Sequence, residues 1–201
     1  MEKYIVITGA SSGIGLEMAK ILASKNYNLI LVARNFDRLQ SIKHDLESKY
    51  SIKVKIFRKD LSLSANAEAL YLEIKKENLE VEYLINNAGV GNYGHFIETS
   101  LQEELNMIEL NISSLVILTK LFSQDMVKRG SGSIMNVASL LSFLPFPYYS
   151  VYSASKSFVL AFSETVNAEL EGTGVMVKAL CPGPIDTGFT TSEMTTTNAY
   201  K

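Results

Sequence analysis

The sequence contains almost none of the residues from which disulfides and metal centres are made. Cys181 is the one cysteine among 201 residues, so the chain can form no disulfide within itself and suits a reducing, cytoplasmic environment. The two histidines, His44 and His95, show no paired spacing with this cysteine. We therefore expect no metal site.

An excess of charge of one sign is also absent, because 19 basic residues stand against 21 acidic ones and the formal net charge is −2. Such a balance gives no broad field that would attract a nucleic acid or an anionic membrane. No stretch reaches about 18 uninterrupted apolar residues, and no basic leader precedes the first apolar run. We expect a cytoplasmic protein with no nucleic-acid partner and no membrane partner.

The sequence does have a hydrophobic fraction of 47%, which is enough for the core of a single domain spanning residues 1–201. Six short runs rich in Ile, Val and Leu are expected to be strands covered on both faces: residues 4–8, 28–33, 53–57, 83–86, 132–137 and 175–181. Apolar residues at helical spacing lie between them, at 13–26, 37–50, 63–76, in two segments within 100–128, and at 152–171.

This alternation predicts both the fold class and the place of the ligand. We expect an α/β protein with a doubly wound, mainly parallel sheet of about six strands and with helices on both faces. Ligands of such sheets bind beyond the carboxyl ends of the strands. Residues 190–201 are polar and lack periodicity, so we expect a flexible tail there.

A glycine-rich turn follows the first expected strand and opens into a helix. It reads Thr8-Gly9-Ala10-Ser11-Ser12-Gly13-Ile14-Gly15. Gly9 allows a sharp reversal, Gly13 lets the backbone approach a pyrophosphate, and Gly15 lets the helix pack close to the strand. N–H groups at the helix start attract phosphate. We interpret the turn as a dinucleotide site, and a merely flexible loop is the alternative.

The end of the second expected strand indicates which dinucleotide is bound. Ala33 and Arg34 supply no acid for the adenosine ribose, whereas a guanidinium suits an adenosine phosphate, so NADP(H) is favoured over NAD(H). The alternative is a surface arginine that merely ends a strand. Asp60 and Leu61, after the third strand, could accept from the adenine amine and pack beneath its ring, although an Asp at this place is also a common helix cap.

Further motifs follow along the chain: Asn86-Asn87-Ala88-Gly89, Asn111, Ser139, Tyr152-x-x-x-Lys156, and Pro182-Gly183 with Thr187. Together with the glycine turn, their order and spacing resemble the compact branch of the short-chain dehydrogenase/reductase family over most of the chain. The resemblance implies a Rossmann-like fold, a nicotinamide dinucleotide and reversible hydride transfer at a carbonyl or alcohol carbon. Members of this branch usually continue through a further helix and a seventh strand, so the chain looks truncated at its C-terminus beside them.

Tyr152 and Lys156 lie one helical turn apart, so both side chains point from one face of the expected helix. A nearby ammonium lowers the pKa of a phenol, ordinarily about 10, by about 1–3 units, and Tyr152 could then exchange a proton with a carbonyl oxygen. Ser139, after the fifth strand, could hold that oxygen. The alternatives are a solvated helical lysine and a simple turn serine.

The resemblance adds roles that the residues alone do not define. It implies that Lys156 also bonds the nicotinamide ribose and that Asn111 holds a water in a proton relay; a buried amide satisfied by backbone is the alternative for Asn111. It places Ile185 and Thr187 near the nicotinamide carboxamide, although a proline-rich turn is the plainer interpretation of residues 182–187. The full set of implied cofactor contacts also includes Ser11, Ser12, Ile14, Asn87, Ala88, Gly89, Pro182 and Gly183.

Residues 140–149 are unusually apolar and aromatic for a loop. We expect them to line the substrate side of the site and to favour an apolar or ring-containing substrate, unless they pack between subunits. Because most members of the family assemble, the resemblance implies a homodimer or homotetramer.

Two hypotheses from different classes follow. The leading one is an NADPH-preferring carbonyl reductase or alcohol dehydrogenase acting on a small-molecule carbonyl or secondary alcohol. The other is a catalytically silent dinucleotide-binding module with a regulatory or interaction role, which the short C-terminus keeps open. A sugar-nucleotide epimerase shares the Tyr-x-x-x-Lys spacing but needs a substrate domain for which this sequence has no room.

Overall fold

The computed structural model describes residues 2–184, which form one six-stranded sheet flanked by helices. The strands are β1 (Lys3–Thr8), β2 (Asn28–Ala33), β3 (Val54–Arg58), β4 (Glu80–Asn86), β5 (Gly132–Val137) and β6 (Val175–Leu180). The helices are α1 (Gly13–Ser24), α2 (Phe36–Lys49), α3 (Ala65–Lys76), α4 (Leu101–Ile108), the π-helical turn η1 (Glu109–Ser113), α5 (Ser114–Arg129), the 3-10 turn η2 (Leu140–Ser142) and α6 (Ser150–Glu169).

Three expectations fall on residues outside the described range. These are the positions of Ile185 and Thr187 and the flexible tail at residues 190–201. They stay predictions, as does the single domain spanning residues 1–201.

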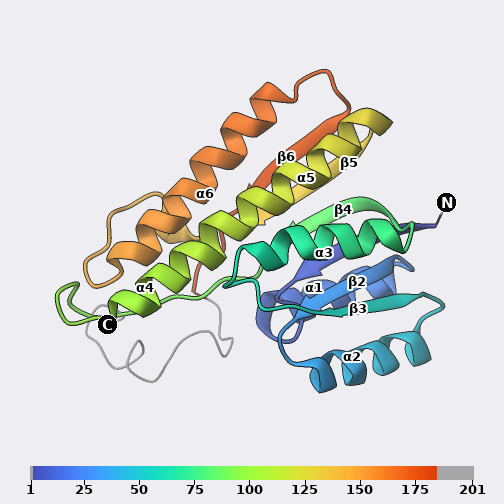
Figure 1. The fold of residues 1–201 in the computed structure, drawn as a ribbon, viewed down its shortest axis with the longest axis horizontal. Helices are drawn as coiled ribbons and strands as arrows, with labels where there is room; N and C mark the ends of the chain where they lie inside the picture. The colour runs from blue at the N-terminus through green and yellow to red at the C-terminus, as the bar shows by residue number, and fades with distance from the viewer. Residues whose placement is uncertain (1, 185–201) are drawn as a thin grey trace.

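All strand pairings in the sheet are parallel, and the strand order is β3-β2-β1-β4-β5-β6. The chain begins in the middle of the sheet, builds outward to β3, and then returns to β4 on the other side of β1 (Figure 1). The strand order therefore reverses between β1 and β4. The connections on either side of this switch point run in opposite directions, which opens a crevice at the carboxyl ends of β1 and β4. The predicted fold class is confirmed.

Alternate side chains of the central strands enter two separate cores. Val6 and Ile30 pack into the core that contains residues of α3 and α5, whereas Ile5 and Leu29 pack into the core that contains residues of α1 and α2. The edge strand β6 differs, because Met176 is 47% exposed and no described helix covers that face of the strand. The expectation that every strand is covered on both faces is therefore wrong for β6.

Helices α4 and α5 are joined by η1 into one nearly continuous helix beside α6, where the sequence indicated two segments (Figure 1). This stretch, Leu101–Arg129, is long enough to cross a membrane and contains an 18-residue window apolar enough to do so, by length and composition alone. Part of it is a core helix, since Leu118, Phe122 and Met126 of α5 pack against the sheet. Core helices of soluble proteins pass the same test, so the expected absence of a membrane partner stays a prediction.

A buried network of polar side chains joins β4, β5, α5 and α6 beneath the carboxyl end of the sheet. The Asn86 amide donates to Asn136 Oδ1 at 2.9 Å and to Thr119 Oγ1 at 3.1 Å. The Asn136 amide in turn donates to Ser163 Oγ at 2.9 Å. Because these groups are almost fully buried, each bond replaces water that the side chains lose on folding. The network fixes β4 against β5 where their loops begin.

We predict that Asn136→Ala lowers the free energy of unfolding by about 1–3 kcal/mol, because it leaves Asn86 and Ser163 without their buried partner. Urea denaturation followed by circular dichroism measures this change. The matched control is Asn106→Ala in α4, an exposed asparagine, which should change stability by less than about 0.5 kcal/mol. Equal effects of the two substitutions would contradict the role given to the network.

Candidate active site

The glycine turn after β1 is built so tightly that side chains cannot replace its hydrogens. Gly9 and Gly13 have φ of +66° and +52°, in the left-handed region that favours glycine. A Cβ at Gly15 would lie 2.4 Å from the Gly9 carbonyl oxygen, so α1 could not start this close to the end of β1. Gly9 and Gly15 therefore serve reversal and close packing as the sequence suggested, whereas the approach of a pyrophosphate to Gly13 stays a prediction.

The turn after β4 is hydrogen-bonded to this glycine turn. Asn87 Nδ2 donates to the carbonyl oxygens of Thr8 at 2.9 Å and Gly9 at 3.3 Å. In the reverse direction, the backbone N–H groups of Asn87 and Ala88 both donate to Thr8 Oγ1 at 2.9 Å. Asn87 and Ala88 thus hold the turn in shape, and Thr8 is a functional residue that the sequence reasoning did not single out.

The start of α1 has the features of a phosphate site. Ser12 occupies the N-cap position but its side chain makes no bond to the helix, so it does not satisfy the N–H groups of the first turn, which includes Ile14. A helix start of this kind carries partial positive charge and unsatisfied donors. Together with the glycine hydrogens that leave room for a close approach, it fits a pyrophosphate. Ser11 precedes it in the same turn.

Lys156 is buried at the carboxyl end of β5, with 5% of its surface exposed. Its ammonium donates to the carbonyl oxygen of Val137 at 2.8 Å and lies 5.9 Å from the centre of the Tyr152 ring. Burial lowers the pKa of Lys156 from 10.5 to about 8, and nearby Cys181 opposes this by a smaller amount. Lys156 is therefore not the solvated lysine of the alternative reading.

Gly89 brings Lys156 and Asn111 together. A Cβ at Gly89 would lie 3.1 Å from Asn111 Oδ1 and 3.3 Å from Lys156 Nζ, so both side chains approach the space that a glycine leaves open. The loop after β4, the π-helical turn η1 and helix α6 meet at this point. Gly89, Asn111 and the pair of Tyr152 and Lys156 come from three separate segments of the sequence and share one end of the sheet.

The side chain of Asn111 is held mainly by backbone. Its Oδ1 accepts from the Val90 N–H at 3.0 Å, and its amide donates to the Val90 carbonyl at 2.9 Å and to Ser155 Oγ at 3.1 Å. Both amide hydrogens are occupied, so a relay water would need the second lone pair of Oδ1 or the main-chain carbonyl. The relay stays a prediction, and the described role of Asn111 is to clamp the loop after β4 to α6.

Ser139 lies at the start of η2, where its hydroxyl oxygen accepts from the Leu141 N–H at 3.2 Å. Among residues 2–184 this hydroxyl donates to no partner, so its hydrogen is available for an incoming oxygen. The side chain of Ser142 accepts from the Ser139 N–H at 3.2 Å and donates to the Lys156 carbonyl at 2.8 Å. Ser142 therefore ties the Ser139 turn to α6.

The sequence reasoning missed Ser142 and Ser155, which join the pieces of the site. A weak signal was present, because serine favours helix ends and turns over helix interiors, yet Ser153, Ser155 and Ser157 all occur within the helix that carries Lys156. Their hydroxyls bond to carbonyl groups of α6 or of the preceding loop. The partners themselves could not be read from the sequence.

A hollow of about 260 Å³ lies at the carboxyl ends of β2 and β3, lined by Arg34, Arg58, Lys59, Asp60 and Asn66. Asp60 Oδ1 accepts from the N–H and the hydroxyl of Ser62 at 3.0 and 2.7 Å, and this hydroxyl bond is the main reason that the pKa of Asp60 is lowered. The carboxylate thus shapes a turn before α3. Leu61 is 5% exposed and belongs to the core beside the hollow.

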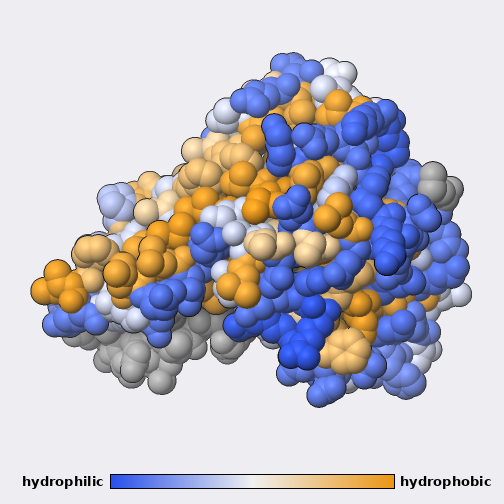
Figure 2. Space-filling model, viewed as in Figure 1, coloured by the Kyte–Doolittle hydropathy of each residue, from blue (hydrophilic) through white to orange (hydrophobic). Residues whose placement is uncertain are grey.

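The loop before α4 and the loop after η2 form an apolar and aromatic surface next to Tyr152. The rings of Tyr93 and Tyr149 meet edge to face, with their centres 5.0 Å apart, and Tyr149 is itself buried against Tyr152. Figure 2 shows hydrophobic side chains gathered over the α4 end of the molecule. The exposed members there are Phe96, Ile97, Leu101, Leu105 and Ile108, and the loop after β5 adds Leu140, Phe143 and Leu144.

Pro182 follows β6 and meets the Ser139 turn, because the Leu140 N–H donates to the Pro182 carbonyl at 2.9 Å. Gly183 comes directly after it, and a Cβ there would meet nothing within 4 Å. The structure therefore brings the segment after β6 to the same edge of the sheet as Ser139. The described part of this segment ends at residue 184.

All these features lie at the carboxyl edge of the sheet, around the switch between β1 and β4. A protein arranged in this way has the doubly wound, Rossmann-like fold, whose ligands bind at this edge of the sheet. The family model for short chain dehydrogenases matches residues 3–198, and the chain belongs to that family. The resemblance stated from the motifs is thereby confirmed.

Three relatives illustrate the match. The chain is 37% identical to 17-beta-hydroxysteroid dehydrogenase type 3 of Mus musculus, over 94% of this chain and 62% of the relative. It is 39% identical to the very-long-chain 3-oxoacyl-CoA reductase of Pyrenophora tritici-repentis, over 88% of this chain and 53% of the relative. The structure of a short-chain dehydrogenase from Sphingobium yanoikuyae in complex with NADPH superposes with a TM-score of 0.88 at 33% identity, covering 93% of this chain and 73% of that one.

The chain thus spans between about half and three fifths of the length of these two curated relatives. The family and the cofactor-binding fold follow from the matched part. The activity of the whole protein, its substrate and its preference between the two nicotinamide dinucleotides are a matter for proposal.

We predict that burial of Lys156 makes stability depend on pH between 8 and 10.5. In this window the unfolded chain keeps a proton on Lys156 that the folded chain has lost, so the free energy of unfolding rises with pH. Below pH 8 both states bind the proton and this contribution is constant. Urea denaturation over a pH series should show that Lys156→Met removes the rise.

The matched control is Lys120→Met, an exposed lysine of α5, which should keep the wild-type pH dependence. The difference between wild type and each variant isolates one lysine from all other groups that titrate in this range. A Lys156→Met profile parallel to that of the wild type would show that the ammonium is not buried in solution.

Proposed function

We propose that this chain is an NADP(H)-dependent dehydrogenase/reductase that interconverts a carbonyl and a secondary alcohol on an apolar small molecule. The observation that carries the proposal is the buried ammonium of Lys156 beside the Tyr152 ring. Burying an ammonium with a backbone carbonyl as its described acceptor is costly, and such arrangements gather at catalytic sites. Family membership supports the same conclusion.

The geometry described above and the family resemblance support the following assignment of residues that would hold the cofactor. The glycine turn and the start of α1 receive the pyrophosphate, and Arg34 receives the adenosine phosphate. Lys156 also serves the nicotinamide ribose. When bound, a reduced nicotinamide supplies the hydride to the carbonyl carbon.

The chain's own residues transfer the proton and stabilise the charge that develops. Tyr152 donates its phenolic proton to the carbonyl oxygen during reduction, and the same oxygen accepts a hydrogen bond from Ser139 as negative charge develops on it. The cation of Lys156 stabilises the tyrosinate that remains. In oxidation the tyrosinate removes the alcohol proton. The reaction is balanced, since one hydride and one proton convert the carbonyl to an alcohol.

An apolar substrate is supported by the side chains around this point. Met107, Tyr149 and Tyr152 form one buried cluster, against which Phe146 and Leu141 pack. The names of two relatives specify a hydroxysteroid and a very-long-chain 3-oxoacyl thioester, both of which carry the reacting oxygen on a largely apolar skeleton. The proposed substrate class is therefore a ketone or secondary alcohol of this kind, with no nucleic acid involved.

The expected homodimer or homotetramer and the cytoplasmic setting remain part of the proposal. Support for association comes from the exposed apolar residues of α4, among which Leu101 is 69% exposed. The same residues serve equally well as an approach surface for an apolar substrate.

We predict that Tyr152→Phe lowers kcat by about 10²–10⁴-fold, because the ring stays in place while the proton donor is lost. Oxidation of NADPH is followed by absorbance with a panel of ketones and aldehydes, and NADPH binding by fluorescence. Binding should be retained.

Tyr27→Phe serves as the control, because this tyrosine is 44% exposed and directly precedes β2, at the end of the strand opposite the site. Wild-type turnover by Tyr152→Phe would overturn the assignment of the proton donor. A wild type that binds NADPH and turns over no substrate in the panel would support the catalytically silent module instead.

The cofactor preference gives a separate prediction. Wild-type protein should bind NADPH more tightly than NADH, and Arg34→Ala should raise the Kd of NADPH by about 10-fold or more, because a charge-assisted hydrogen bond is lost. The Kd of NADH should stay unchanged. Fluorescence titration measures all four constants, and equal affinity of the wild type for both dinucleotides would refute the preference.

A further inference from the structure

Arg58 shares the hollow at the ends of β2 and β3 with Arg34. The two strands pair in parallel register with Ala33 opposite Arg58, and the Lys59 N–H continues the pairing by donating to the Ala33 carbonyl at 3.1 Å. Arg34, directly after Ala33, therefore lies next to the end of β3, and both arginines line the same hollow. The sequence reasoning used Arg34 and passed over Arg58.

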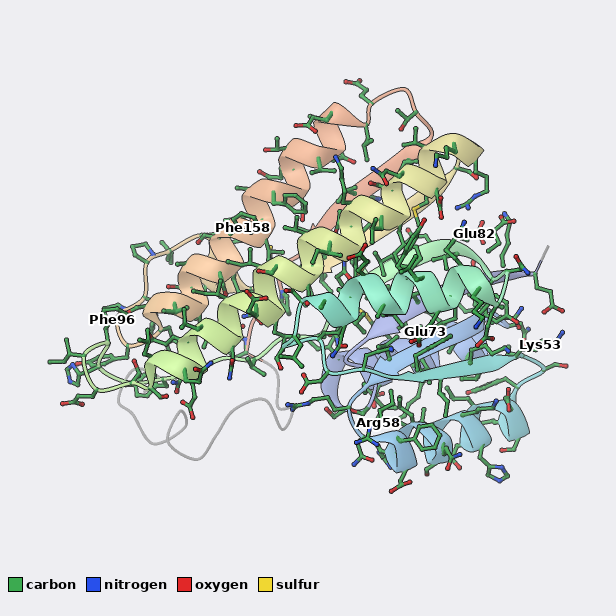
Figure 3. The ribbon with its side chains drawn as sticks, in the orientation of Figure 1. Lys53, Arg58, Glu73, Glu82, Phe96 and Phe158 are labelled. Atoms are coloured by element: carbon green, nitrogen blue, oxygen red, sulfur yellow. The ribbon has the colours of Figure 1, made fainter. Side chains whose placement is uncertain are left out.

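Cations along β3 are otherwise neutralised by acids. Lys53 pairs with Glu2, Lys55 pairs with Glu77 at 2.7 Å, and Lys59 pairs with Glu73 at 2.6 Å. Arg58 is the exception, because between residues 2 and 184 its guanidinium makes no hydrogen bond and no ion pair. Figure 3 places Lys53 at one end of the strand and Arg58 at the other, which is the end where ligands of parallel sheets bind.

The hollow has an excess of positive charge. Arg34 and Arg58 line it with one acid, Asp60, while Lys59, which also lines it, is paired with Glu73. Arg34 also has no ion pair in the described part of the chain. Two exposed guanidinium groups that share a hollow repel each other, and an anion between them removes that repulsion.

We propose that Arg58 is a second ligand of the adenosine phosphate and, with Arg34, sets the preference for NADP(H). A phosphate monoester carries close to two negative charges at neutral pH, so a single guanidinium neutralises only part of it. Guanidinium groups bind phosphate oxygens with paired hydrogen bonds, and two of them approaching from neighbouring strands complete the charge balance. This inference rests on the proposed function, since it assigns a further residue to the same cofactor site.

The test compares ligands that differ only in that phosphate. Fluorescence titrations give the Kd of NADPH and NADH, and competition gives the Kd of adenosine 2′,5′-bisphosphate and adenosine 5′-monophosphate. Arg58→Gln should weaken binding of the two ligands with the extra phosphate by about 10-fold or more and leave the other two within about twofold. Arg58→Lys, which keeps the charge but loses the paired geometry, should show a smaller loss.

Two reference variants are measured beside Arg58→Gln. Arg34→Gln should reproduce the loss, and Lys53→Gln should not, because this lysine has the same charge at the opposite end of β3. A loss of equal size in Lys53→Gln would mean that net charge, and not contact with Arg58, governs affinity, and would overturn the inference.

The remaining outcomes separate the inference from the proposed function. If the wild type binds NADPH and NADH equally, the cofactor preference itself fails and Arg58 has no phosphate to hold. If Arg34→Gln lowers the preference for NADPH and Arg58→Gln does not, the preference stands and the role of Arg58 is refuted. Because Arg58 is exposed, thermal unfolding followed by circular dichroism should show a folded variant in every case.

Discussion

The bond from the Lys156 ammonium to the Val137 carbonyl holds the site together, because it ties α6 to the end of β5. A buried ammonium without an acceptor is strongly destabilising, so the helix can dock only where this carbonyl meets it. That docking fixes Tyr152 one turn earlier in α6 and brings the ammonium to the gap at Gly89, where Asn111 also lies. A larger residue at position 89 would separate all three elements.

The parallel sheet explains why residues so far apart in the chain can meet. Each strand ends at the same edge, and polar side chains directly after the strands bond across to the neighbouring loop, as Thr8 does with the backbone of Asn87 and Ala88. The buried bonds of Asn86 and Asn136 set β4 against β5 one residue earlier. These bonds tie the loops of the site to the end of the sheet.

The sequence predicted the strands best where apolar runs end abruptly. β2 and β5 match the expected bounds, whereas β4 begins at Glu80 and not at 83, because Glu80 and Val81 pair with β1 although Glu80 is acidic. The π-helical turn that holds Asn111 and the serine bonds to α6 could not be read from the sequence, since both depend on contacts between distant segments. Arg58 was missed because the distribution of partners among cations is a tertiary property.

Charge placement, and not total charge, determines what this protein can attract. At the amino end of the sheet the lysines are matched by acids, as in the pair of Lys3 with Glu82 at 3.0 Å, whereas at the carboxyl end Arg34 and Arg58 have no such match within residues 2–184. A formal charge of −2 therefore coexists with a local positive site. Because screening limits exposed charges to about 10 Å, a small anion at that edge experiences the arginines and little of the acidic remainder.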